Sequence, residues 1–344
     1  MQRKFYLDLA ASGHRMPIGA HLVLHQHADP EAITLDGARL GAVIAETATR
    51  FKTPLAVPLM DLTVEKAALL AACGVPEGEV ARHRFTSPPP PPARIPSTAR
   101  MRATCEAIRH VAALPGLVPL GMAIGPFSLV TQLLPDPITP IFLAGSGLSA
   151  DAEPEIALLD AALALAERVI HVHLEAQIEA GAKALLICEP AANTVYFSPK
   201  QLAKSHDVFE RYVMEPMRRL AALLEPRGVD LLFHDCGELT DGMLRRFATL
   251  GAAIISLGSS RRLWEDAALL PKDVVLYGNL PTKWFYAPQL SVAEVERMAI
   301  ELLERMRAAQ HPFILGSECD VLSVAGAEAE ILGKVEAFMR CRRS

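Results

Sequence analysis

Apolar residues fall into two kinds of run that alternate along this chain. Short runs, mostly apolar throughout, are separated by longer runs in which apolar and polar positions recur with a helical period. Such alternation is typical of repeated strand–helix units and of a parallel sheet. The short runs that we interpret as strands are residues 20–25, 54–61, 117–125, 183–189, 229–236, 252–258, 273–279 and 312–319.

Two of the longer runs carry clear helix boundaries. The run at 154–182 opens with Pro154, a residue tolerated in the first helical turn, and reaches Gly181 at its end. The run at 291–310 begins with Ser291 and has Glu294 three residues later, which is the pattern of a capping box.

Eight strand–helix repeats predict an α/β fold, a single (β/α)8 TIM barrel that takes in residues 1–344. An open doubly wound sheet is the alternative, but such a sheet more often has fewer strands and a glycine-rich phosphate loop. The chain contains neither G-x-G-x-x-G nor G-x-x-x-x-G-K-[ST]. We expect residues 1–16 to form a short helical extension that caps the barrel floor.

Residues 86–98 form a proline-rich stretch in which proline density excludes a helix. We predict a stiff surface loop there. A linker between two domains is the alternative, although the strands on both sides belong to one series of eight.

Composition narrows the classes of function. The formal net charge is −5 with no Lys/Arg-rich run, so nothing in the charge pattern indicates a nucleic-acid partner. No apolar stretch approaches the roughly 20 residues that span a membrane, and the N-terminal residues are too polar for a signal peptide. We therefore expect a cytoplasmic protein. Its six cysteines are then reduced, which favours a metal-binding or catalytic role for any special one.

Most predicted strands end in residues that can carry chemistry or shape a site. In a (β/α)8 barrel the active site lies at the carboxyl ends of the strands, so these residues would gather at one mouth. The strand ends are His25, Asp61, Gly125–Pro126, Glu189, His234–Cys236, Gly258, Asn279 and Cys319.

The sharpest pattern is His234-x-Cys236 at the end of the fifth strand, with Cys319 at the end of the eighth. Side chains alternate faces along a strand, so His234 and Cys236 point to one side and Asp235 to the other. One imidazole and two thiolates suit zinc, and three protein ligands leave a fourth position open, as in catalytic zinc sites. The alternative is that these are ordinary buried core residues, since cysteine is commonly buried.

The chain resembles the methylcobamide:coenzyme M methyltransferases, which belong to the uroporphyrinogen decarboxylase superfamily. The similar segments run over nearly the whole length and include residues 58–75, 123–134, 177–202, 234–237 and 313–320. The resemblance implies a (β/α)8 barrel, zinc bound by His234, Cys236 and Cys319, and transfer of a methyl group from a methylated corrinoid to a thiol. The chain has no D-x-H-x-x-G motif, so we expect the corrinoid to be carried by a partner protein.

The chain departs from the family pattern in two places. The fourth strand usually ends in an aspartate followed by a serine, whereas here it ends in Glu189–Pro190 with Asn193 nearby. The last motif reads Ser-Glu-Cys where a small residue usually precedes Cys319. These differences leave the acceptor open, and coenzyme M is one candidate thiol.

The true decarboxylase of the superfamily binds the propionates of a porphyrinogen with an arginine-rich segment. The matching residues 21–30 contain no arginine. Without such cations a multiply anionic tetrapyrrole loses its charge-assisted partners, which argues against decarboxylation.

Individual roles follow from position. Glu189 is predicted to contact the metal or take the thiol proton, with an ordinary salt bridge as the alternative. Asp61 is predicted to orient the acceptor or to hydrogen-bond a ligating histidine, with a cap on the next helix as the alternative. Asn279 and His25 are predicted substrate-binding residues. His25 and His27 are also possible extra ligands, although a loop histidine is more often solvated.

Two other functions stay open at this point. The chain could act on the donor side, taking a methyl group from a methoxylated compound and giving it to the corrinoid. It could instead be a non-catalytic protein that holds a ligand in the barrel mouth.

Overall fold

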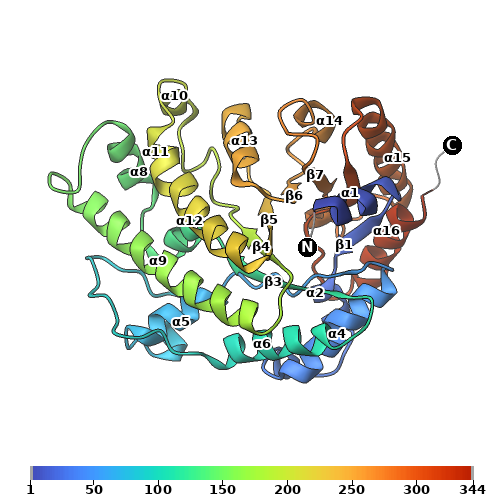
Figure 1. The fold of residues 1–344 in the computed structure, drawn as a ribbon, viewed down its shortest axis with the longest axis horizontal. Coiled ribbons are helices and arrows are strands. Elements are labelled where there is room, and N and C mark those ends of the chain that lie inside the picture. The colour runs from blue at the N-terminus through green and yellow to red at the C-terminus, as the bar shows by residue number, and fades with distance from the viewer. Residues whose placement is uncertain (1–2, 342–344) are drawn as a thin grey trace.

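Eight parallel strands form one curled sheet in this computed structural model, which describes residues 3–341 (Figure 1). Their order is β1-β8-β7-β6-β5-β4-β3-β2, the order of a (β/α)8 barrel with its seam between β1 and β2. The predicted fold class is confirmed. The strands are β1 Arg15–Ile18, β2 Leu55–Ala56, β3 Val118–Ile124, β4 Ala184–Cys188, β5 Asp230–Asp235, β6 Ile254–Leu257, β7 Val275–Leu280 and β8 Phe313–Asp320.

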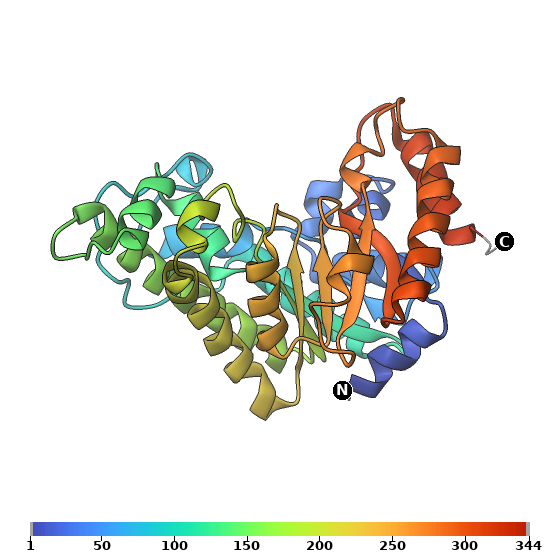
Figure 2. The same ribbon diagram turned by 90° about the horizontal axis from the view of Figure 1, so that it is seen from above.

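Helices cover the outside of the sheet, which Figure 2 shows from a second direction. Among the described residues, none of the helices combines the length and apolar character needed to cross a membrane. The α-helices are α1 Arg3–Ala11, α2 Ala20–Leu24, α3 Pro30–Thr34, α4 Gly37–Arg50, α5 Val64–Ala72, α6 Ala99–Ala112, α7 Pro126–Leu133, α8 Ile138–Gly145, α9 Pro154–Glu179, α10 Pro199–Leu202, α11 Asp207–Phe209, α12 Glu215–Leu224, α13 Asp241–Phe247, α14 Leu263–Asp266, α15 Val292–Ala309 and α16 Glu328–Arg340. The short 3-10 turns are η1 Glu77–Glu79, η3 Glu225–Arg227, η4 Ala248–Leu250 and η5 Thr282–Trp284, and η2 Glu210–Met214 is a π-helical turn.

The predicted first strand at residues 20–25 is wrong. Residues 20–24 form the helix α2, whose Leu22, Val23 and Leu24 are all buried, and the strand β1 precedes it. When a short apolar run is buried on every side, its hydrophobic pattern does not distinguish a strand from a helical turn. Pro17 made β1 hard to recognise in the sequence, because proline is normally confined to edge positions of a sheet. The strand tolerates this proline because it pairs only with β8.

The second strand is also shorter than the predicted 54–61. Only Leu55–Ala56 pairs with β3, between Pro54 and Pro58. Neither proline has an N–H to give to a ladder. The chain from residue 57 onward therefore forms a loop over the barrel mouth, and it carries Met60 and Asp61.

The core has two parts, one inside the barrel and one between the barrel and its helices. Leu120, Leu186, Leu232, Ile254 and Tyr277 belong to the inner cluster, and each comes from a different strand. A larger cluster joins the outer faces of the strands to the helices. Strands buried on both faces explain why the sequence showed continuous apolar runs rather than alternation.

The N-terminal helix lies at the floor of the barrel. Arg3 of α1 donates hydrogen bonds to the carbonyls of Gly251, Ala252 and Asp273, in the loops that enter β6 and β7. The described part of the predicted extension at 1–16 thus holds a helix over Arg3–Ala11, and its last residues enter β1.

Three other local predictions have clear outcomes. Residues 86–98 contain neither helix nor strand, and Arg168 of α9 donates to the carbonyls of Pro92 and Ala93 to hold this loop. Helix α9 opens with Pro154 as predicted. Helix α15 begins after Ser291, whose capping box with Glu294 is complete.

A fully buried lysine fixes the loop that follows β7. Lys334 of α16 has no solvent exposure, and its Nζ donates to the carbonyl oxygens of Phe285 (2.6 Å) and Ala287 (2.9 Å) and contacts Glu330 Oε1 (2.6 Å). Removing this donor leaves the Phe285 carbonyl without its lysine partner, while the Ala287 carbonyl still accepts from the Leu290 N–H (3.1 Å). A buried carbonyl that loses its donor is costly.

We predict that Lys334→Met lowers the free energy of unfolding by about 2–4 kcal/mol, measured by urea denaturation. Lys272→Met is the matched control, because exposed Lys272 also donates to two carbonyls, those of Ala309 and Gln310. Water can replace that donor, so its loss should cost less than about 1 kcal/mol. Equal losses in both variants would show that burial of Lys334 does not matter.

Candidate metal centre

His234 is the buried member of the predicted ligand set. It lies on β5 opposite Ser256 of β6, and its Nδ1 is 2.8 Å from the Ser256 hydroxyl. Its Nε2 is buried and has no hydrogen-bond partner among the described residues. A metal-binding histidine commonly has its second nitrogen fixed in this way. Nε2 is therefore the ring nitrogen left for a metal.

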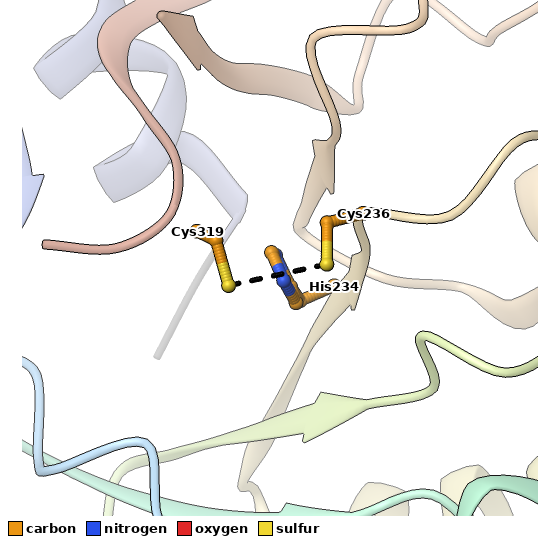
Figure 3. A group of neighbouring side chains, drawn as sticks. All are labelled: His234, Cys236 and Cys319. Carbon is orange, nitrogen blue, oxygen red and sulfur yellow. Dashed lines mark hydrogen bonds between the residues drawn. The ribbon is translucent and has the colours of Figure 1, made fainter. Parts of the chain in front are cut away.

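The two cysteines complete the group. Cys236 follows β5 and Cys319 lies near the end of β8, and their sulfurs are 3.9 Å apart. One ligand atom from each of the three residues lies within 4.8 Å of the others (Figure 3). Bonds of about 2.0–2.3 Å place the ligand atoms of tetrahedral zinc roughly 3.3–3.8 Å apart. The two sulfurs are already close to that spacing.

The electrostatic state of the pair suits a metal ligand. The hydrogen bond with Cys319 and the neighbouring His234 and Lys283 lower the pKa of Cys236 to about 3, against the opposing effect of burial. The same hydrogen bond and burial raise the pKa of Cys319. The lowered pKa favours the thiolate form of Cys236, and thiolate is the form that binds metals.

A cleft of about 610 Å³ opens on the Cys319 side of this group. Met60, Asp61, Lys283 and Asp320 line it together with Cys319. Met60 Sδ lies 3.8 Å from Cys319 Sγ. The cleft gives a small molecule access to one side of the ligand group.

Glu189 does not join the three ligand atoms. Its buried carboxylate accepts hydrogen bonds from the backbone N–H groups of Phe127 (3.2 Å) and Ser128 (2.5 Å) at the start of α7. A Cβ at position 125 would come within 2.2 Å of Glu189 Oε2, so Gly125 is needed for this close approach. Burial raises the pKa of Glu189 to about 7. These contacts make it a helix cap, and its catalytic role stays a prediction.

Asp61 lines the cleft but has its own partners. Its Oδ1 accepts from the Thr63 N–H (3.0 Å) and hydroxyl (2.6 Å), and its Oδ2 pairs with Arg100. This turn leads directly into α5, which agrees with the alternative of a cap. Among the described residues no hydrogen bond joins Asp61 to His234, so its action on an acceptor stays a prediction.

The other predicted site residues are also engaged locally. His25 ends α2, lines the cleft, and has its Nε2 3.1 Å from His21 Nε2. His27 pairs with Glu46 and lies outside the ligand group. Their proposed extra ligation finds no support in this geometry, and substrate binding by His25 stays a prediction.

The side chain of Asn279 connects the end of β7 to the loop that follows β6. Its buried amide donates to the carbonyls of Gly258 (2.8 Å) and Arg261 (2.9 Å), which lie in the loop after β6. This use of the amide keeps the barrel mouth in shape. Substrate binding by Asn279 stays a prediction.

Sequence reasoning missed two residues beside the centre. Ser256 orients His234, and Lys283 is near enough to both cysteines for their charges to raise its pKa, although burial acts in the opposite direction. Position alone could have found Lys283, since it lies in the loop after a predicted strand, where barrels place their active-site residues.

The comparisons with known proteins agree with this architecture. No curated protein matches the chain. The solved structure of the methyltransferase from Methanosarcina mazei matches it with a TM-score of 0.69 and 19% sequence identity, covering 98% of each chain. At that identity the match shows a shared fold. The uroporphyrinogen decarboxylase (URO-D) family matches residues 42–343. Because that match takes in most of the 344 residues, the chain belongs to the uroporphyrinogen decarboxylase (URO-D) family.

Proposed function

We propose that this protein is a zinc-dependent methyltransferase, which moves a methyl group from a methylated corrinoid, carried by a partner protein, to a small-molecule thiol such as coenzyme M. The observation that carries the proposal is the meeting of one imidazole nitrogen and two sulfurs at the barrel mouth. The similar fold named as a methyltransferase from Methanosarcina mazei supports it. The membership of the URO-D family is consistent with it.

The residues fit a zinc ion. Nε2 of His234 is buried without a partner, and a nitrogen with two soft sulfurs is a preferred donor set for zinc. His234, Cys236 and Cys319 would hold the ion. When bound, zinc would supply a Lewis acid that keeps an acceptor thiol in its reactive thiolate form at neutral pH.

The residues of the chain prepare the site for such an acceptor. Ser256 fixes the imidazole plane through its hydrogen bond to Nδ1. The cleft beside Cys319 admits a small thiol from one side. The sulfur of the acceptor would supply the electron pair of the new carbon–sulfur bond, and the cobalt of the corrinoid would keep the pair of the broken cobalt–carbon bond. The proton of the thiol would go to solvent or to a nearby base. The corrinoid must approach through the same mouth, because the opposite floor is covered by α1.

Two alternatives predict different behaviour. A donor-side methyltransferase would take a methyl group from a methoxylated compound and give it to the corrinoid. A ligand-holding protein would transfer nothing and would need no metal. The sulfur-rich donor set favours the thiol-directed reaction, because the thiolate acceptor is itself a soft ligand.

We predict that the purified chain contains about one zinc ion, measured by elemental analysis, and that Cys319→Ser and His234→Ala each lose most of it. Cys73→Ser is the control, because Cys73 ends α5 and is outside the ligand group. It should keep the wild-type zinc content. Unchanged zinc in Cys319→Ser, in a folded variant with a normal circular dichroism spectrum, would contradict the ligand assignment.

We also predict methylation of a thiol when the zinc-loaded protein is mixed with methylcobalamin and coenzyme M or homocysteine. Loss of the methyl–cobalt absorbance follows the reaction. Cys236→Ser should lower kcat/KM by at least about 100-fold, because losing a metal ligand removes the site that activates the thiol. Activity only in the other direction, from a methoxylated compound to reduced cobalamin, would instead identify the donor-side enzyme.

A further inference from the structure

Met60 brings a third sulfur to the candidate metal centre. It lies in the loop that follows β2, and its Sδ is 3.8 Å from Cys319 Sγ. The sulfurs of Cys319 and Cys236 are 3.9 Å apart. Two sulfurs bonded to one tetrahedral zinc ion at about 2.3 Å are roughly 3.8 Å from each other. Met60 Sδ therefore has the spacing from Cys319 Sγ that a further sulfur ligand needs.

The side chain of Met60 contacts both the barrel interior and the cleft. It packs against the inner cluster, to which Cys188 and Met122 belong. It is also partly exposed, and it lines the cleft together with Cys319. The thioether is therefore on the side of the ligand group from which a small molecule arrives.

The loop that carries Met60 is anchored just beyond this residue. The carboxylate of Asp61 pairs with Arg100 of α6. The Nε2 of Gln132, on α7, donates to the carbonyl oxygen of Leu62 (3.2 Å). A group held in place before binding loses less entropy when it meets its ligand. The two contacts thus hold the backbone of the loop so that Met60 is presented to the cleft.

We propose that Met60 Sδ is the fourth, displaceable ligand of the metal centre, which occupies the open position until the acceptor thiol replaces it. This inference rests on the proposed function and assigns the position that His234, Cys236 and Cys319 leave open. Thioether sulfur is a soft donor, as thiolate is, and belongs to the ligands that suit zinc. It carries no charge, so an incoming thiolate binds the cation more strongly and displaces it.

The same residue would help the product to leave. The product of the proposed reaction is a methyl thioether, which is the donor group of the Met60 side chain itself. The product sulfur therefore offers the metal no better donor than Met60 does. Because Met60 is tethered beside the site, its effective concentration there is higher than that of a free small molecule. Its return to the open position would favour release of the product.

A packing role for Met60 has to be separated from ligation. A distance of 3.8 Å also suits van der Waals contact between two sulfurs, and methionine commonly fills irregular gaps in a core. In that case Met60 would lie near the metal without a bond to it. The two roles differ in the distance from the metal to the heteroatom of Met60, which X-ray absorption measures directly.

The test uses the whole chain with selenomethionine in place of every methionine, loaded with zinc alone. X-ray absorption at the zinc edge then detects a bonded selenium, which scatters differently from sulfur and nitrogen. Met60→Leu removes one selenium and keeps a similar side-chain volume. Met122→Leu is the matched control, because Met122 belongs to the same inner cluster but does not line the cleft beside Cys319.

We expect one selenium neighbour per zinc, at a distance slightly longer than the zinc–sulfur bond of about 2.3 Å. The signal should be absent in Met60→Leu and present in Met122→Leu. It should disappear from the wild type when 2-mercaptoethanol is added, because a thiolate replaces the thioether. Met60→Leu should also bind zinc about three- to tenfold more weakly, measured by competition with a chromophoric chelator.

Zinc bound without a selenium neighbour, in a folded wild-type chain, would overturn the inference and leave the proposed function standing. A selenium neighbour that persists in Met60→Leu, or in the wild type with saturating 2-mercaptoethanol, would also overturn it. A chain that binds no zinc would contradict the proposed function and this inference with it. The two failures are therefore distinguishable.

Discussion

The parallel register between neighbouring strands is the constraint on which the candidate metal centre depends. His234 lies opposite Ser256, and the ladder continues from β6 through β7 to β8, where Cys319 lies. A slip of one residue in any of these pairings would turn the side chains of a strand to the other face. Asp235 would then occupy the place of His234. Backbone hydrogen bonds between the strands therefore bring the three side chains together.

Further polar contacts orient the side chains and hold the loops at the barrel mouth. Ser256 turns the imidazole, Asn279 ties the loop after β6 to β7, and Lys334 anchors the loop after β7. Glu189 follows β4 and lies outside the candidate ligand group, where its carboxylate caps the start of α7. Each of these polar groups is buried and has its partners, so the mouth of the barrel has a defined shape before a ligand enters.

The sequence predicted the barrel, and it predicted that His234, Cys236 and Cys319 lie close together. The physical reasons for these predictions also explain where the sequence failed. Strands β3 to β8 were found within a few residues because they are buried on both faces. The His-x-Cys pattern indicated two of the candidate ligands, because strand alternation places His234 and Cys236 on a shared face. Pro17 concealed β1, because a proline is not expected inside a strand. Lys283 stands in a loop, where no periodicity indicates a direction.

The seam between β1 and β2 has a mechanical consequence. These strands end the hydrogen-bonded order, and across the seam Thr53 Oγ1 contacts Met16 Sδ at 3.3 Å in place of a backbone ladder. The segments that follow them carry His21, His25, Met60 and Asp61 along the cleft. The barrel wall is therefore easiest to deform along this seam, which reaches the open end of the barrel. The opening can widen for a bulky ligand without breaking any strand pairing.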